Sequence, residues 1–184
     1  MLVDSALQCA YLLIMAAEKH TPELVRLADD GLFPNSKFPL LCYRSAVGEA
    51  GAAAVEELFH SNRWDRSWRN GVFPYHHYHS TAHEVLGCYS GWAEVQFGGP
   101  SGTTIRLEAG DVVVIPAGGA HKRISSSADF AVVGAYPPGP DWDMNYGKAE
   151  ERERAIANIS AVPPPEKDPV AGANGPLHAA WKLA

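Results

Sequence analysis

The feature that most constrains the fold is a change in the residue pattern in the middle of the chain. From residue 71 to residue 136, short runs rich in Val, Ile, Tyr and Phe are separated by Gly, Pro and Ser. Runs of this kind are typical of the strands of an antiparallel sandwich or barrel, in which turns join each strand to the next. The middle of the chain therefore predicts an all-β body.

The segment before this body predicts three further elements. We expect a short helix at 21–29, because Thr21 can cap it and Pro22 suits the first helical position. Residues 38–44 are mostly apolar and predict a strand. Apolar residues then recur at helical spacing, which predicts an amphipathic helix at 46–60.

The segment after the body predicts a wrap around it. Prolines at 137–140 break regular structure, and residues 148–159 are charged enough to predict a surface helix. Residues 163–176 are expected to be extended and to lie over the surface. Directly after residues 137–140, Asp141, Trp142 and Asp143 could fold across a barrel mouth or build a dimer contact.

The size of the chain predicts one domain with additions. Its 184 residues, 46% of them hydrophobic, can bury one core but are too few for two ordinary domains. We expect an N-terminal apolar extension or helix at 1–20 and a single domain at 21–184. Within that domain, the core barrel should span about 38–136, and the C-terminal wrap and helix 137–184.

Charge and cysteine content exclude some functions. The formal net charge of -6 leaves no basic stripe for nucleic acid or for anionic membranes. The apolar stretch 6–17 is too short to cross a bilayer, which takes about 20 residues, and no Lys or Arg precedes it. The three cysteines have no close-spaced pair, which indicates reduced thiols and a cytoplasmic protein.

A cluster of histidines is the strongest functional signal. His77 and His79 are two residues apart, so on a strand their side chains point the same way, while His76 points the opposite way. The turn-like residues 80–83 should reverse the chain and bring Glu84, at the start of the returning strand, opposite the histidine pair.

A third imidazole could join the pair. His121 follows a turn containing Pro116 and Gly118, and it would reach the site if its strand lies beside the first hairpin. The sequence thus predicts a metal centre of His77, His79, Glu84 and His121. The alternative is a set of buried, hydrogen-bonded polar residues without a metal.

The spacing of these residues resembles the two motifs of the cupin superfamily. The first motif matches Gly71, His77, His79, Glu84 and Gly91, and the second matches Gly110, Pro116, Gly118 and His121. The second motif usually ends in Asn four residues after its His, where this chain has Ser125. The wider pattern is similar to the small, uncharacterised bacterial YjlB-type cupins. The resemblance implies a double-stranded β-helix, a jelly-roll-like barrel that is commonly dimeric and holds a metal near one mouth.

Other residues near the ligands are weaker candidates. Tyr75 and Arg123 share the inward phase of His77 and His121, so they could contact a substrate or act catalytically. Each could equally pack against the ligands or orient them. His83 is expected to face away from the ion.

Three imidazole nitrogens and one carboxylate oxygen suit one divalent transition metal ion per chain: iron, manganese, nickel, cobalt, copper or zinc. Four protein ligands leave two positions open on a six-coordinate ion, so we expect a small polar or acidic molecule to bind it directly. The resemblance favours an oxidoreductase of the dioxygenase type. The alternatives are a metal-dependent isomerase or decarboxylase, and a non-catalytic metabolite-binding cupin.

We also expect a homodimer. The N-terminal apolar segment and the helix at 46–60 offer more non-polar surface than one barrel wall covers.

Overall fold

The computed structural model describes residues 21–48 and 51–182. The strands within these ranges are β1 (Glu23–Val25), β2 (Leu40–Tyr43), β3 (Asp65–Asn70), β4 (Glu84–Ser90), β5 (Trp92–Phe97), β6 (Thr103–Glu108), β7 (Val112–Ile115), β8 (His121–Ser126) and β9 (Ala131–Tyr136). The helices are α2 (Ala52–Ser61), α3 (Ala149–Ala161) and α4 (Pro176–Ala180). The expected extension or helix at 1–20 lies outside the described residues.

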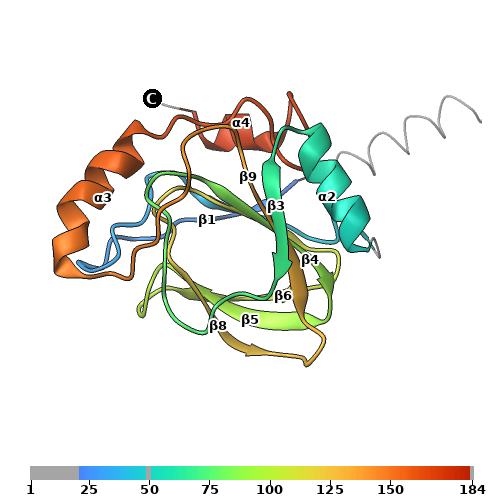
Figure 1. Ribbon diagram of the computed structural model, residues 1–184, viewed down its shortest axis with the longest axis horizontal. Helices are drawn as coiled ribbons and strands as arrows, with labels where there is room; N and C mark the ends of the chain where they lie inside the picture. The colour runs from blue at the N-terminus through green and yellow to red at the C-terminus, as the bar shows by residue number, and fades with distance from the viewer. Residues whose placement is uncertain (1–20, 49–50, 183–184) are drawn as a thin grey trace, which may run out of the picture.

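The strands form two antiparallel sheets that face each other (Figure 1). The larger sheet has the order β1-β2-β7-β4-β9-β3, and the smaller has the order β6-β5-β8. Neighbours in these orders are mostly distant in the sequence, as in a chain that winds repeatedly between two walls. The predicted all-β fold, a double-stranded β-helix with peripheral helices, is confirmed.

Two cores hold this barrel together. The inner core lies between the sheets and includes Leu86 and Val113 of the larger sheet with Phe97 of the smaller one. The outer core covers the other face of the larger sheet with Phe59 of α2 and Trp181 near the C-terminus. The central strands of the larger sheet, β2, β7, β4 and β9, are therefore mostly buried on both faces. In contrast, β5 of the smaller sheet alternates between buried and half-buried residues.

Helix α2 confirms the amphipathic helix predicted at 46–60, although it begins only at Ala52. Its buried residues, Val55 and Phe59, lie against Gly87 of β4. A Cβ atom at Gly87 would come within 2.6 Å of Val55 Cγ1, so a glycine here allows the helix to approach the sheet closely. The apolar face of α2 is thus covered by its own barrel.

The prediction of a helix at 21–29 is wrong. Residues Glu23–Val25 form strand β1, which pairs with β2 at the edge of the larger sheet. Val25 and Leu27 pack on the inner core, so the burial and hydrogen bonding gained by pairing outweigh the local capping signals. Pro22 precedes the strand, a position at a sheet edge that tolerates the missing N–H.

The remaining expectations for the ends of the chain are only partly met. Helix α3 confirms the charged helix at 148–159. The tail at 163–176 does not merely lie over the surface, because Asp168 and Val170 are buried. It leads into α4, which was not predicted, and Trp181 Nε1 donates to Pro39 O at 2.8 Å.

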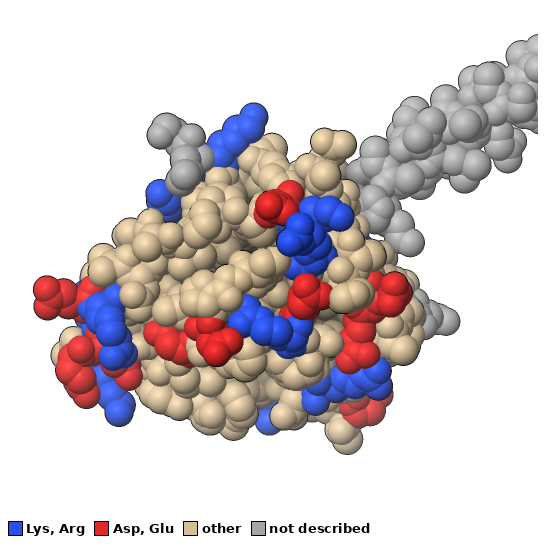
Figure 2. Space-filling model, turned by 45° about the horizontal axis from the view of Figure 1, so that its top comes forward, with Lys and Arg blue, Asp and Glu red and all other residues tan. Residues whose placement is uncertain are grey.

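Three properties of the described chain bear on its surroundings. Cys42 and Cys88 are buried and free of disulfides. In the part of the chain that the structure describes, no helix combines the length and the apolar character needed to span a membrane. On the face shown in Figure 2, Lys and Arg side chains of the described residues are interspersed with Asp and Glu, without a broad basic area.

Candidate metal centre

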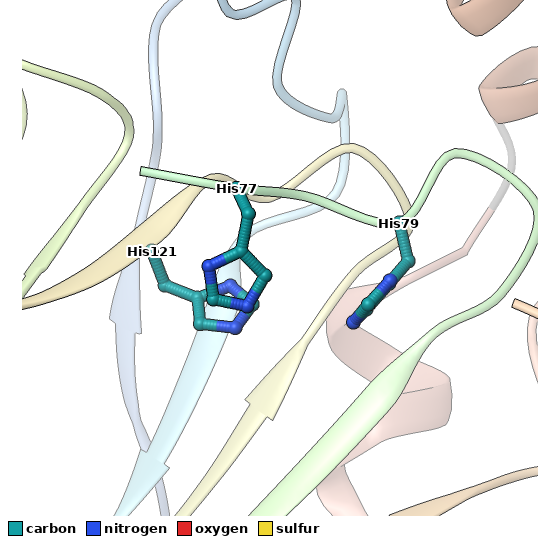
Figure 3. Close-up of side chains that lie close together, drawn as sticks. All are labelled: His77, His79 and His121. Carbon is teal, nitrogen blue, oxygen red and sulfur yellow. The ribbon is translucent and has the colours of Figure 1, made fainter. Parts of the chain in front are cut away.

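Three buried imidazoles meet at one end of the barrel interior. His77, His79 and His121 each offer a nitrogen, and these atoms all lie within 4.8 Å of one another. Figure 3 shows the three rings turned toward a common point. No other group of three His, Cys, Asp or Glu in the described part of the chain meets the geometry of a metal site.

Backbone pairing brings these histidines together. His77 N donates to His121 O at 3.2 Å, and His121 N donates to His77 O at 3.0 Å, so the two residues form an antiparallel bridge. His79 O accepts from Gly118 N at 2.8 Å. Gly118 has a φ of +91°, and a Cβ there would lie 2.7 Å from Asn35 O, so a glycine is needed at this turn.

Glu84 reaches the histidines by a different route from the one expected. It does begin a strand, β4, but that strand pairs with β7 and β9 and not with the segment that carries His77 and His79. The expected hairpin is therefore wrong. The carboxylate comes from the larger sheet, with Oε2 3.3 Å from His121 Nε2 and 3.6 Å from His79 Nε2.

Backbone carbonyls orient all three imidazoles. The Nδ1 atoms of His77, His79 and His121 lie 3.1, 2.5 and 3.2 Å from the carbonyl oxygens of Tyr75, Asp143 and Gly119. Each Nδ1–H can therefore donate to its carbonyl, which leaves the lone pair on Nε2. Metal-binding histidines are commonly oriented in this way by a partner behind the ring.

The two oxygens of Glu84 have different partners. Oε1 accepts from the Tyr136 hydroxyl at 2.8 Å, and that hydroxyl in turn accepts from Trp68 Nε1 at 3.3 Å. Oε2 is buried and makes no hydrogen bond to the described residues. A buried carboxylate oxygen without a donor is costly, so the donor set fits a divalent cation at this point.

Electrostatics favour the charge states that a metal needs at Glu84, His77 and His121, but not at His79, where the ion pair with Glu84 favours the protonated ring. Burial opposes ionisation of Glu84, but the neighbouring imidazoles of His79 and His121 outweigh it and lower the pKa of this carboxyl to about 2. Burial lowers the pKa of His121 to about 3 and also lowers the pKa of His77. For His79, burial is outweighed by Glu84, which raises its pKa.

A cavity of about 280 Å³ adjoins the site. The site residues line one part of it, and the remaining wall is made by Trp68, Arg69, Asn70, Gly71, Val72, Phe73, Leu86, Tyr136, Trp142 and Met144. A second cavity, of about 410 Å³, lies outside the barrel among prolines such as Pro138 and Pro164. The smaller cavity is the one with the convergent ligand set, which is the better criterion for a functional site.

Neither predicted catalytic candidate lines the smaller cavity. The side chain of Tyr75 is exposed, with its ring stacked on Phe73 at a centroid distance of 5.0 Å. Arg123 donates from Nε to Val72 O at 3.1 Å and from Nη1 to Ser126 Oγ at 2.9 Å. Its guanidinium therefore supports the loop before the histidine segment.

The sequence reasoning missed the role of Tyr136 and left that of Trp142 open. Tyr136 is the last residue of the predicted body, and nothing in its spacing relates it to Glu84. Trp142 stacks on Tyr136 at 4.2 Å and lines the cavity, so the segment after β9 does fold across the mouth. Asp143 fixes that segment by accepting from Ser80 N at 2.6 Å.

Three other expectations concern residues beside the ligands. His83 faces away from the site, as predicted, and is buried in the outer layer. His76, which was expected to point away from His77 and His79, is half-buried, with the centroid of its ring 5.4 Å from that of Phe33. Ser125, which replaces the usual Asn of the second motif, donates to Glu94 Oε2 at 2.8 Å and does not support the ligands.

The barrel and the two motifs within it define the chain as a cupin. No family model matches it. Over 154 residues, the chain is 47% identical to the uncharacterized protein YjlB of Bacillus subtilis, covering 83% of this chain and 92% of that protein. The chain therefore belongs to the YjlB family.

Several solved structures have folds similar to that of this chain. Acireductone dioxygenase from Bacillus anthracis, with a cadmium ion in its active center, matches 78% of this chain and 91% of its own, with 16% identity and a TM-score of 0.38. An uncharacterized conserved protein with a double-stranded β-helix domain from Klebsiella pneumoniae matches 71% and 87%, with 16% identity and a TM-score of 0.37. These scores are too low for the chemistry of those proteins to be transferred.

Proposed function

We propose that this protein is a metal-dependent oxidoreductase of the dioxygenase type, with one divalent transition metal ion held by His77, His79, Glu84 and His121. The observation that carries the proposal is the pairing of each imidazole with a carbonyl on one side only, while Glu84 Oε2 has no partner among the described residues. Three imidazole nitrogens and one carboxylate oxygen, all on buried residues, are a donor set that suits a first-row divalent ion.

The residues of the chain have separable roles in this proposal. A bound ion supplies Lewis acidity and sites for oxygen ligands. The carbonyls of Tyr75, Asp143 and Gly119 hold the imidazoles, and Tyr136 holds Glu84. The cavity wall is mostly apolar beside the site, so that a metabolite bound through its oxygens lies against apolar groups.

The test has two stages. Protein purified without chelators is first analysed for metal; a content near one ion per chain supports the centre. The protein is then loaded anaerobically with ferrous ion and supplied with oxygen and a panel of diketones, catechols and thiols. Oxygen uptake with a substrate supports the dioxygenase, and uptake should vanish in the His77→Ala/His79→Ala variant but not in His76→Ala.

Other outcomes separate the alternatives. Bound metal with no uptake, but with conversion of a substrate in the absence of oxygen, would replace the oxidoreductase by an isomerase or decarboxylase. A compound that raises the melting temperature of the metal-loaded protein and is recovered unchanged would indicate a non-catalytic binding protein. Protein without metal, which also fails to take up any of the six candidate metals, would contradict the proposal entirely.

We further propose that the protein is a cytoplasmic homodimer. The free thiols of Cys42 and Cys88 are consistent with a reducing compartment. Because α2 is covered by its own barrel, a dimer contact must use other apolar surface, such as Leu24 on edge strand β1 and Leu32, both exposed. Light scattering should give twice the chain mass, and a monomer at all concentrations would contradict the dimer.

A further inference from the structure

The wall of the metal-site cavity is mostly apolar beyond the ligands. Six of its side chains are Trp68, Val72, Phe73, Leu86, Trp142 and Met144. Phe73 and Trp142 are also partly exposed, at 41% and 39%, so the aromatic character extends to the opening. A ligand that reaches the metal site must therefore bring apolar surface to match this wall.

Two stacked aromatic rings form one side of the cavity. The rings of Trp142 and Tyr136 are stacked at 4.2 Å with an interplanar angle of 5°. The Arg66 guanidinium carbon lies 5.7 Å from the Tyr136 centroid and 5.6 Å from that of Trp142. A stack supported by a cation favours planar ligands, because a flat molecule gains contact along the whole ring face.

The arginines around the cavity are already engaged. Arg69 is part of the lining, but its side chain alternates along β3 with that of Trp68, which packs on the inner core, and so lies on the outer face of the sheet. There, its Nε and Nη2 donate to the two carboxylate oxygens of Glu56 on α2 at 2.9 and 2.5 Å. Arg66 donates to Asp141 Oδ1 at 3.0 Å, and Arg123 donates to Val72 O and Ser126 Oγ. Within the described residues, the cavity lining thus contains no cation without an acidic partner.

The charges at the site set a limit on the ligand. Three neutral imidazoles, one carboxylate and a divalent ion sum to one positive charge, which a singly deprotonated pair of oxygens would neutralise. A further carboxylate or phosphate would lie beside Leu86 and Met144 without a counter-charge, which is costly in an apolar environment. The volume of about 280 Å³ lies at the lower end of the range of ligand pockets, about 300–1,000 Å³, which favours a small ligand.

We propose that the ligand of this site is a small planar molecule with two adjacent oxygens on an otherwise apolar body, such as a catechol or an enediol, and without a phosphate or carboxylate group. This inference rests on the metal centre proposed above. It also narrows the expectation of a polar or acidic metabolite, since the polar part of the ligand is limited to the oxygens that face the metal.

The test measures binding to the full-length, cobalt-loaded protein under anaerobic conditions, by tryptophan fluorescence and by the visible spectrum of cobalt. The probes are 4-methylcatechol and 3,4-dihydroxybenzoate, which differ by a methyl group in place of a carboxylate. We expect 4-methylcatechol to bind about tenfold more tightly, because the carboxylate finds no counter-charge. The Trp142→Ala variant should weaken 4-methylcatechol by about tenfold, whereas Trp92→Ala, on β5 and away from the cavity, should not.

Two outcomes would overturn the inference. Equal or tighter binding of 3,4-dihydroxybenzoate to the natural protein contradicts the ligand class, and it leaves the metal centre intact if elemental analysis finds cobalt. Protein that holds no cobalt would instead refute the metal centre, and the inference with it.

Discussion

His83 and Glu84 are neighbours in the sequence, yet they belong to two different buried regions. His83 points into the outer layer between the larger sheet and the C-terminal segment. There, Ala117 N donates to His83 Nδ1 at 2.8 Å, and His83 Nε2 donates to Pro163 O at 3.1 Å. Glu84 points into the barrel, where its Oε2 has no hydrogen-bond donor among the described residues.

Buried carboxylates show the same contrast. Asp168, in the outer layer, accepts from the Tyr43 hydroxyl, from Val170 N at 2.8 Å and from Leu177 N at 3.1 Å. Both of its oxygens are used within the chain. The comparison teaches that burial of histidines and carboxylates does not by itself indicate a metal site. A metal site is indicated by possible metal-ligand atoms that the chain leaves without hydrogen-bond partners.

The largest effect should come from removing two of the proposed metal ligands. In the His77→Ala/His79→Ala variant, metal affinity should fall by more than about 100-fold, because loss of ligands costs more than loss of the groups behind them. Isothermal titration with zinc measures this, and circular dichroism confirms that the variant folds. His76→Ala, beside the same segment, is the control. Unchanged zinc affinity in the double variant would remove the distinction between the two regions.

The outer histidine should show the reverse behaviour. His83→Ala leaves Ala117 N and Pro163 O without their partner and opens a space beside Trp181, whose ring centroid lies 4.6 Å away. We expect the free energy of unfolding to fall by about 3 kcal/mol, with metal content per folded chain unchanged. Urea unfolding and elemental analysis check the two parts. A variant that is as stable as the natural protein but has lost its metal would reverse the assignment.

The comparison also shows what could be predicted from the sequence. The β-rich body and the three histidines follow from local patterns, because strand alternation and turn residues act over a few positions. The helix expected at 21–29 failed because Val25 and Leu27 gain more from the inner core than from local helix signals. The role of Tyr136 could not be predicted, since it depends on the register that pairs Val85 with Ala135 and so brings β9 beside Glu84.

The smallest effect should come from the hydroxyls that hold the two carboxylates. Tyr136→Phe removes the donor to Glu84 Oε1 and leaves the carboxylate free to turn, so zinc affinity should fall by about tenfold. Tyr43→Phe is the matched control, because it removes the same atom from the tyrosine that binds Asp168 in the outer layer. It should lower the free energy of unfolding by about 1 kcal/mol and leave zinc affinity unchanged. If both variants bound zinc as tightly as the natural protein, the Tyr136 hydroxyl would be as purely structural as that of Tyr43, and the ligand set would owe its orientation to the backbone carbonyls alone.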